Sequence, residues 1–354
     1  MSTPNSILAI RLSSFGDVLM TIPAVKALKE YYPHAHLTWL VEGSVGELLT
    51  HQGFIDEVIR FPRGSIQSAM KKGNLTSATK QTKRFLKKLR GGEYDLILDF
   101  HGIIKSALFS KMVKGKRIIG FGKTLAKEKS HLFYHECVEC ENKRLHKMER
   151  NMLIPRHIGV DMTIPAVKLE SPPDAESYID EFFTRERVVS PIFAINPFSS
   201  KGSAFKRWEM ERYAELIRRI TAENIGKVII LWGPGEKGEA QRLKKMAGEE
   251  ALLSCSTDVP QLLALLHRVD MYVGGDTGMM HLAALAGTPV LAIFGPTDHK
   301  VNGPYGPIHR IIRKDLPCSP CRNKNCQERR CLTGIAVDEV LREVIELYEK
   351  IKGN

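Results

Sequence analysis

An aspartate stands in a tight turn near the start of the chain, where its carboxylate can accept a proton or cap a helix. Residues 7–10 form an apolar run that predicts a buried strand, and residues 18–28 have apolar side chains at helical spacing. Between them, Gly16 is followed directly by Asp17. A dinucleotide-binding fold has G-x-G-x-x-G here, so that backbone amides face a phosphate. This turn therefore presents a carboxylate where a phosphate loop would present amides.

A second segment, residues 272–284 (YVGGDTGMMHLAA), has the pattern of an anion-binding turn. The predicted strand ends at two glycines, Asp276, Thr277 and Gly278 form the turn, and a helix follows. The first amides of a helix are unpaired and lie at its positive end, so they bind phosphate oxygens. Thr277 can add a hydroxyl donor, and His281 lies one turn into the helix. The alternatives are a helix cap at Asp276 or Thr277 and a packed histidine.

Two further loops follow predicted strand ends in the same half of the chain. Ser199 and Ser200 come after the strand over 192–195, and Lys206 stands just before the next helix. Hydroxyls and a lysine in this position suit phosphate oxygens. Glu236 closes the loop 232–236 (WGPGE) and can accept hydrogen bonds from ribose hydroxyls. Three such loops on one sheet predict a site for a nucleoside diphosphate.

The elements that position these loops alternate between short strands and helices, which predicts parallel α/β sheets. In the first half we expect strands over 7–12, 37–41, 57–61 and 96–99, and helices over 23–32 and 45–49. In the second half we expect strands over 192–195, 227–232, 271–274 and 290–294, and helices over 209–222, 236–247, 259–266 and 279–286.

The length of 354 residues and the apolar content of 43% suit two globular domains. We expect a Rossmann-like domain over 1–165, a linker over 166–190 that contains Ser171-Pro172-Pro173, a second Rossmann-like domain over 191–336, and an amphipathic helix over 337–354. The early apolar run is interrupted by Arg11, and no stretch reaches about 18 apolar residues. We therefore expect a cytoplasmic protein without a secretory signal or a spanning helix.

The positive charge is concentrated in the first domain. The chain carries a formal charge of +12, yet residues 60–130 hold 18 Lys and Arg against four acids, so the remainder sums to about −2. Such a sector suggests an acidic partner, either a nucleic acid or a membrane surface with phosphates. A solvated helical face, such as residues 80–90, explains part of it.

Four of the seven cysteines follow a C-x2-C-x4-C-x4-C pattern, namely Cys318, Cys321, Cys326 and Cys331. The spacing resembles a zinc knuckle with cysteine in place of histidine, and four thiolates can hold a structural Zn²⁺. The alternative is a set of free or redox-active thiols. A knuckle and a basic sector would suit a nucleic-acid-binding protein. However, the two features lie in different domains and the stacking aromatics are missing, so we expect no nucleic-acid partner.

Together the motifs resemble glycosyltransferase family 9, the ADP-heptose:lipopolysaccharide heptosyltransferases. The matching segments are 11–17 (RLSSFGD), 99–102 (DFHG) with Ser106, 206–208 (KRW), 232–236 (WGPGE), 275–284 (GDTGMMHLAA) and 294–298 (FGPTD). The resemblance runs from the first strand to the closing helix. It implies a GT-B fold, in which two Rossmann-like domains face each other across a cleft. It also implies that the first domain binds the acceptor, that the second binds the ADP-sugar, and that this inverting transfer requires no metal.

The resemblance also implies roles for single residues. Asp17 takes the position of the catalytic base, which removes the proton of the acceptor hydroxyl. The implied donor-binding residues are Ser199, Ser200, Lys206, Glu236, Asp276, Thr277, Gly278 and His281. The implied acceptor-binding residues are Ser14, Gly16, His101 and Lys105. Lys206 and the helix start at Thr277 would offset the charge of the leaving ADP.

The acceptor implied by the resemblance is the Kdo-containing inner core of lipid A. The basic sector would then bind its phosphates and carboxylates, with the protein on the cytoplasmic face of the inner membrane. The heptose added can be the first, the second or a later one. The alternative functions are a GT-B glycosyltransferase that uses another nucleotide sugar and, less favoured, a zinc-knuckle nucleic-acid-binding protein.

Overall fold

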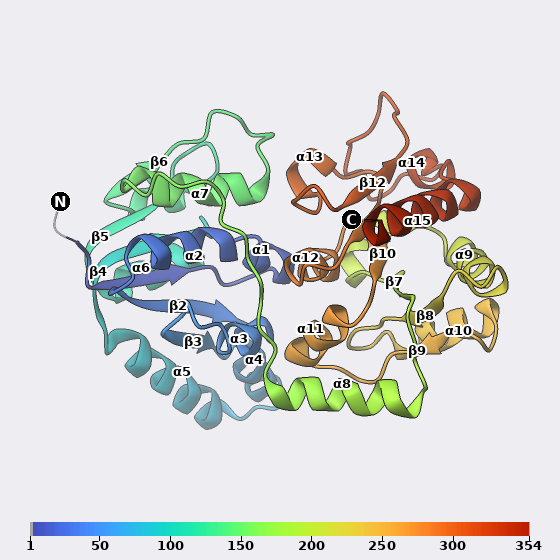
Figure 1. Cartoon of the computed structure of the whole chain (residues 1–354). Helices are drawn as coiled ribbons and strands as arrows, with labels where there is room; N and C mark the ends of the chain where they lie inside the picture. Colours follow the sequence, from blue (N-terminus) through green and yellow to red (C-terminus); the bar gives the residue numbers. More distant parts are fainter. Residues whose placement is uncertain (1–2, 354) are drawn as a thin grey trace. The chain divides into compact units, whose positions relative to one another are not determined.

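The structure, a computed structural model, describes residues 3–353 and divides into two compact units, Met1–Val167 and Lys168–Asn354. Each unit contains a six-stranded sheet whose paired strands run parallel (Figure 1). The prediction of an α/β fold with two Rossmann-like sheets is confirmed. Within residues 3–353, no helix is both long and apolar enough to cross a bilayer.

The first unit has the strand order β3-β2-β1-β4-β5-β6. Its elements are β1 (Ser6–Ile10), α1 (Phe15–Leu19), α2 (Ile22–Tyr31), β2 (His36–Glu42), α3 (Val45–Leu49), β3 (Glu57–Phe61), α4 (Arg63–Lys71), α5 (Leu75–Arg90), β4 (Glu93–Asp99), α6 (Ile104–Met112), β5 (Lys114–Phe121), the 3-10 helix η1 (Ser130–Phe133), β6 (Glu136–Val138) and α7 (Lys147–His157). In this doubly wound order the chain switches direction between β1 and β4, and ligands bind beyond the carboxyl ends of strands at such a point.

The central strand β1 is apolar because both of its faces are covered. Its residues from Ile7 to Ile10 have no exposed surface. Ile10 pairs with Leu40 of β2 on one side and with Asp99 of β4 on the other. This register places the turns that follow β1 and β4 next to each other.

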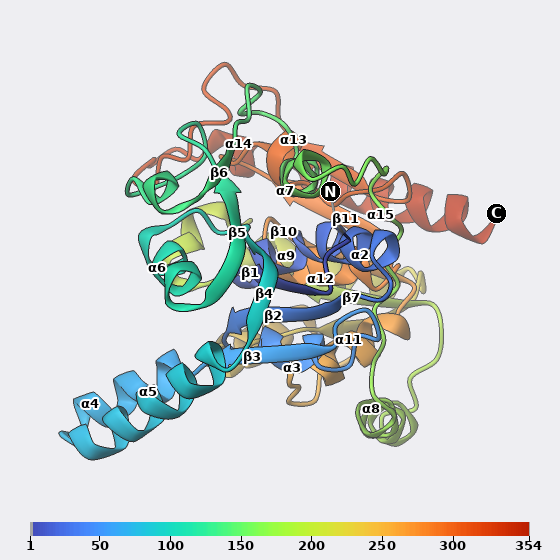
Figure 2. The same cartoon turned by 90° about the vertical axis from the view of Figure 1, so that its left-hand side faces the viewer.

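Helices α4 and α5 form a hairpin after β3. Asn74 caps α5 by accepting a hydrogen bond from the backbone N of Ser77 at 2.9 Å. The Phe85 ring of α5 packs against Phe61 and Phe109, with ring centroids 4.9 and 5.4 Å away. The base of the hairpin is therefore fixed to the domain, while Figure 2 shows the rest of it projecting beyond the β3 edge of the first sheet.

The second unit has the strand order β12-β11-β10-β7-β8-β9, with β7 and β10 as the central pair. Its elements are α8 (Pro173–Arg185), β7 (Ile192–Asn196), the 3-10 helix η2 (Lys201–Lys206), α9 (Met210–Ala222), β8 (Lys227–Ile230), α10 (Lys237–Ala247), β9 (Leu252–Leu253), α11 (Val259–His267), β10 (Met271–Gly275), α12 (Gly278–Leu285), β11 (Val290–Phe294), α13 (His299–Asn302), β12 (Arg310–Arg313), α14 (Arg330–Thr333) and α15 (Val337–Lys352). The connectivity repeats that of the first unit, so its switch point lies between β7 and β10.

The segment 166–190, which the sequence predicts to be a linker, contains the helix α8. Ile179 and Phe182 of α8 are buried, and the helix packs against α11 within the second unit. The closing helix α15 also packs into this unit, where it contacts α9 and buries Val344 and Leu347 in the core. Both amphipathic helices thus complete the apolar core of the second unit.

We predict that Leu347→Ala lowers the free energy of unfolding by about 2–5 kcal/mol, because it leaves a cavity in a packed core. The matched control is Lys350→Ala, one turn along α15 on the exposed face, for which we expect a change within about 0.5 kcal/mol. Urea denaturation followed by circular dichroism measures both values. Equal stabilities for the two variants would contradict the packing of α15.

Candidate functional site

Asp17 lies at the switch point of the first sheet, in α1 beyond the carboxyl end of β1. Two cations contact its carboxylate: Arg11 Nη2 lies 3.2 Å from Oδ2, and Lys147 Nζ lies 2.7 Å from Oδ1. The Ser14 hydroxyl donates a hydrogen bond to Oδ2 at 2.9 Å. The Asp17 side chain keeps 22% of its surface exposed, so it remains accessible to a ligand.

The charge of Asp17 is set by two opposing effects. Burial by itself raises the pKa of Asp17, but the positive charges of Arg11 and Lys147 outweigh it and hold the pKa well below its usual range. The carboxyl group is therefore ionised at neutral pH. An ionised carboxylate with part of its surface open to solvent can accept a proton from a ligand hydroxyl.

Lys147 reaches Asp17 because α7 packs against α2. The side-chain amide of Asn151, one turn further along α7, donates hydrogen bonds to Met20 O at 2.8 Å and to Thr21 Oγ1 at 3.1 Å. These bonds fasten the first turn of α7 to the chain just after Asp17. Lys147 was not predicted as a site residue, because 130 residues separate it from Asp17 and no local pattern connects the two.

The neighbouring turn after β4 places His101 beside this cluster. Burial and the charge of Arg11 lower the pKa of His101 to about 3, so its imidazole is neutral at physiological pH. Asp99 shapes the turn by accepting hydrogen bonds from the backbone N of His101 at 2.8 Å and from the Tyr134 hydroxyl at 2.8 Å. Asp99 is fully buried, and this burial raises its pKa.

Lys105 shares a buried carboxylate with a second cation. Its Nζ lies 2.7 Å from Glu42 Oε2, and Arg63 Nη1 lies 3.1 Å from Glu42 Oε1. Burial alone would raise the pKa of Glu42, but its bonds to Lys105 and Arg63 lower it. Glu42 and Arg63 were not predicted as site residues. Glu42 ends β2 and Arg63 begins α4 just after β3, so only the sheet order brings them beside Lys105.

In the second unit, Lys206 and Asp276 come together at the switch point between β7 and β10. Lys206 Nζ lies 2.7 Å from Asp276 Oδ2, and the two side chains are only 17% and 9% exposed. Thr277 is the N-cap of α12, with its Oγ1 3.5 Å from the backbone N of Met280, so the capping alternative describes its contact. Gly278 begins the helix, and His281 is buried one turn further along it.

The remaining predicted donor residues lie in the loops after β7 and β8. Ser199 Oγ accepts a hydrogen bond from Arg207 Nε at 3.1 Å, and Ser200 Oγ donates one to Ser203 Oγ at 3.1 Å. Glu236 accepts a hydrogen bond from the backbone N of Gly233 at 2.8 Å, and its burial raises the pKa of this carboxyl group.

Of the two alternatives for the cysteine cluster, a structural zinc site and free thiols, the described structure does not form the zinc site. Among residues 3–353, no three or more His, Cys, Asp or Glu side chains are arranged to hold a metal ion. Cys331 packs into the apolar core of the second unit, whereas Cys318, Cys321 and Cys326 lie exposed in the preceding loop. Knuckle spacing alone therefore did not bring four thiols together.

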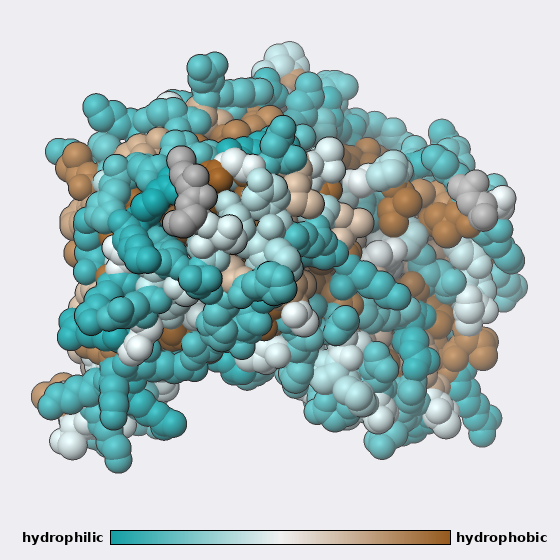
Figure 3. Space-filling view, turned by 60° about the vertical axis from the view of Figure 1, so that its left-hand side comes forward, coloured by the Kyte–Doolittle hydropathy of each residue, from teal (hydrophilic) through white to brown (hydrophobic). Residues whose placement is uncertain are grey.

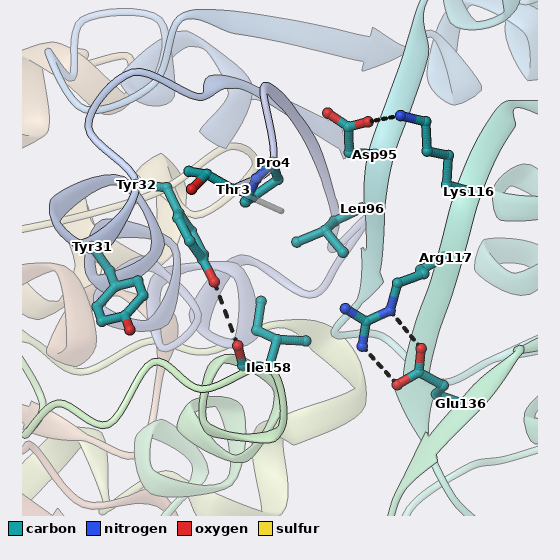
Figure 4. Close-up of a pocket in the computed structure, with 10 residues that line it drawn as sticks. All are labelled: Thr3, Pro4, Tyr31, Tyr32, Asp95, Leu96, Lys116, Arg117, Glu136 and Ile158. Atoms are coloured by element: carbon teal, nitrogen blue, oxygen red, sulfur yellow. Dashed lines mark hydrogen bonds and ion pairs between the residues drawn. The ribbon is translucent and has the colours of Figure 1, made fainter. Parts of the chain in front are cut away.

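A separate pocket of about 790 Å³ lies at the opposite edge of the first sheet, near the amino ends of its strands (Figure 4). Arg117 and Glu136 form a two-bond ion pair in it, at 2.7 and 2.8 Å, and Lys116 lies 2.6 Å from Asp95. None of the predicted site residues lines it. Its charges neutralise each other, so the two switch points remain the candidate sites.

Comparison with known proteins gives the family. The model of glycosyltransferase family 9 (heptosyltransferase) matches residues 82–332. The chain belongs to glycosyltransferase family 9. As a member of this family it is a transferase, in agreement with the prediction from its motifs.

Relatives of the family-9 chain extend over most of its length. It is 27% identical over 315 residues to the lipopolysaccharide core heptosyltransferase OpsX of Haemophilus influenzae, covering 87% of this chain and 84% of the relative. The glycosyltransferase of family 9 from Veillonella parvula superposes with a TM-score of 0.84 at 18% identity, covering 98% of both chains. E. coli heptosyltransferase WaaC with ADP-2-deoxy-2-fluoro heptose superposes with a TM-score of 0.74 at 21% identity, covering 96% of this chain and 99% of that one. The predicted GT-B fold is thereby confirmed.

We predict that Lys147→Met lowers kcat by about 10- to 100-fold, since Asp17 loses one of the two cations that fix its carboxylate. The pKa of Asp17 rises when this positive charge is removed, so the acid limb of the kcat profile shifts to higher pH. The pH dependence of the transfer rate measures both effects.

The matched control is Lys143→Met, which removes the same charge from an exposed side chain four residues earlier. We expect it to leave both kcat and the acid limb unchanged. A Lys147→Met enzyme whose kcat and acid limb match those of the control would show that Lys147 does not position Asp17.

Proposed function

We propose that this family-9 enzyme is an inverting glycosyltransferase that moves heptose from ADP-L-glycero-D-manno-heptose to the Kdo/heptose inner core of lipopolysaccharide. The observation that carries the proposal is the ionised Asp17 held at the switch point by Arg11 and Lys147. Family membership and the names of the relatives supply the sugar and the acceptor class. We assign the acceptor to the unit Met1–Val167 and the ADP-sugar to the unit Lys168–Asn354.

Asp17 is the proposed general base. The acceptor hydroxyl oxygen attacks the anomeric carbon, the bond from that carbon to the ADP oxygen breaks, and the hydroxyl proton passes to an Asp17 carboxylate oxygen. The low pKa of Asp17 keeps it ionised, and proton transfer becomes favourable as the attacking oxygen gains positive charge. Ser14, the backbone at Gly16, neutral His101 and Lys105 are the proposed acceptor contacts.

The donor half of the reaction is assigned to the loops of the second unit. Lys206 and the N-terminus of α12 lie together, and a cation beside unpaired helix amides suits a diphosphate. They would offset the charge that develops on ADP. Ser199 and Ser200 of the loop after β7, and Thr277, Gly278 and His281 at the start of α12, are assigned to the same site. Glu236 is assigned to the adenosine ribose.

The proposed location follows from the acceptor. A Kdo–lipid A acceptor is an anionic glycolipid embedded in a bilayer, so the enzyme would work in the cytoplasm, peripherally on the inner membrane. The excess of Lys and Arg in residues 60–130 supports an acidic partner of this kind. No nucleic-acid partner is proposed.

We predict that Asp17→Asn, which keeps the size of the side chain, lowers the rate of ADP release by about 100-fold or more, because the proton acceptor is lost. The assay uses ADP-heptose with heptose-free and mono-heptosylated Kdo–lipid A as separate acceptors. The acceptor that supports release by the wild-type enzyme identifies the transfer step. A wild-type rate in Asp17→Asn would overturn the assignment of the base.

We predict that Lys206→Ala raises the Kd for ADP by about tenfold or more, since a charge-assisted contact to phosphate is lost and Asp276 is left unpaired beside it. Isothermal titration calorimetry measures the affinity. Lys245→Ala, on the exposed face of α10, removes the same charge away from the proposed site. Equal Kd values for the two variants would remove Lys206 from the donor site.

A further inference from the structure

The α4–α5 hairpin, residues 63–90, carries a dense positive charge and no acidic residue of its own. The sequence contains no Asp or Glu from residue 58 to residue 92. Over this stretch it contains ten Lys and Arg, at positions 60, 63, 71, 72, 80, 83, 84, 87, 88 and 90. A positively charged segment of this length is typical of a surface that binds an acidic partner.

Helix α5 separates its two faces sharply. Ala78, Phe85 and Leu89 are buried against the domain. Lys80, Lys83, Arg84 and Lys87 recur at helical spacing on the opposite side and are exposed. The apolar face is therefore satisfied by the fold, and the basic face is presented outward.

The basic side chains divide into paired and unpaired groups. Arg60, Arg63 and Lys88 are bonded to Glu47, Glu42 and Glu57, respectively. The other seven have no carboxylate within 4.0 Å anywhere in residues 3–353; they are Lys71, Lys72, Lys80, Lys83, Arg84, Lys87 and Arg90. The pairs lie toward the base of the hairpin, so its outer part retains its full charge.

The tip of the hairpin adds exposed apolar side chains to this charge. Met70 at the end of α4 is 57% exposed, and Leu75 at the start of α5 is 66% exposed. Between them lie Lys71, the last residue of α4, and Lys72, which directly follows it. Figure 3 shows a largely hydrophilic projection at the lower left, where the hairpin of Figure 2 extends from the first unit.

We propose that the α4–α5 hairpin docks this enzyme on an anionic lipid bilayer, with its basic face on the headgroups and Met70 and Leu75 in the interfacial region. Clusters of four to eight Lys and Arg on an amphipathic helix bind anionic membranes, and exposed apolar side chains add interfacial affinity. The choice of a bilayer rests on the proposed function, in which the acceptor is a membrane glycolipid.

Two observations favour a bilayer over a nucleic acid. The hairpin contains a single aromatic side chain, Phe85, which is buried and unavailable for stacking on bases. The apolar side chains of Met70 and Leu75 would have no favourable contact on the phosphate backbone of a nucleic acid. The interfacial region of a bilayer, in contrast, accommodates both apolar and basic groups.

The root of the hairpin connects it to the proposed acceptor site. Arg63, the first residue of α4, is bonded to Glu42, which is bonded to Lys105. A hairpin docked on the bilayer thus continues directly into the carboxyl edge of the first sheet, where Asp17 lies. Docking of the hairpin would therefore bring the proposed acceptor site close to the acceptor sugars, which extend from the same bilayer.

The experiment is vesicle co-sedimentation of the full-length protein. Vesicles of phosphatidylethanolamine and phosphatidylglycerol at 3:1 are compared with vesicles of phosphatidylcholine. In the hairpin variant, Lys80, Lys83, Arg84 and Lys87 are each changed to Glu. In the matched control, Arg218, Arg242, Lys245 and Lys350 of the second unit, all exposed, are changed to Glu.

We expect the partition coefficient on anionic vesicles to fall about 100-fold or more in the hairpin variant and by less than about threefold in the control. A second variant, Met70→Ser with Leu75→Ser, changes only exposed tip residues and keeps the charge. It should weaken binding by about tenfold, and this loss should persist at about 0.5 M salt, where charge is screened.

Equal losses in the hairpin variant and the control, equal binding of the wild type to neutral vesicles, or tighter binding to a competing DNA duplex would each overturn the proposal. The vesicles contain no lipid A and the assay no ADP-heptose, so a failure here leaves the transfer reaction untouched. Conversely, failure of the wild type to transfer heptose to a deacylated, soluble acceptor would refute the proposed function and leave the docking result standing.

Discussion

The arrangement of the first unit depends on how the negative charge of the partly buried Asp17 carboxylate is compensated. A carboxylate beyond the end of β1 needs compensation, and Arg11 and Lys147 supply it from the same strand end and from α7. Arg11 is itself held by the carbonyl of Phe100, after β4. The position of the Asp17 carboxylate therefore depends on three features: the pairing of β1 with β4, the packing of α7 against α2, and the turn after β4. The carboxylate remains ionised and partly exposed.

The second unit has the same strand order as the first, but its switch point holds a cation in place of a partly exposed carboxylate. Its switch point holds Lys206 on the buried carboxylate of Asp276 at the start of α12, which places a cation beside the positive end of a helix. The proposed function assigns proton acceptance to the first sheet and anion binding to the second. Identical strand orders thus carry complementary chemistry, because the turns after the strands differ.

The cations of the first unit fall into two groups, those paired with a carboxylate and those without one. Near Asp17 and Glu42 each cation has a carboxylate, which fixes its position and lets it orient a ligand. On the outer face of α5 the cations have no such partners in the part of the chain described. Solvated, unpaired charge is the form that an extended acidic surface attracts, since no internal ion pair has to be broken first.

The sequence by itself determined the α/β class, most central strands, the turn that presents Asp17 and the helix start at Thr277. These depend on local periodicity and turn chemistry, which a short segment carries on its own. It missed Lys147, Glu42 and Arg63. It also did not show that α8 packs within the segment 166–190, and it left the choice between a zinc site and free thiols open at the four cysteines. Those features were decided by the tertiary structure, since strand order and helix packing choose neighbours across as many as 130 residues.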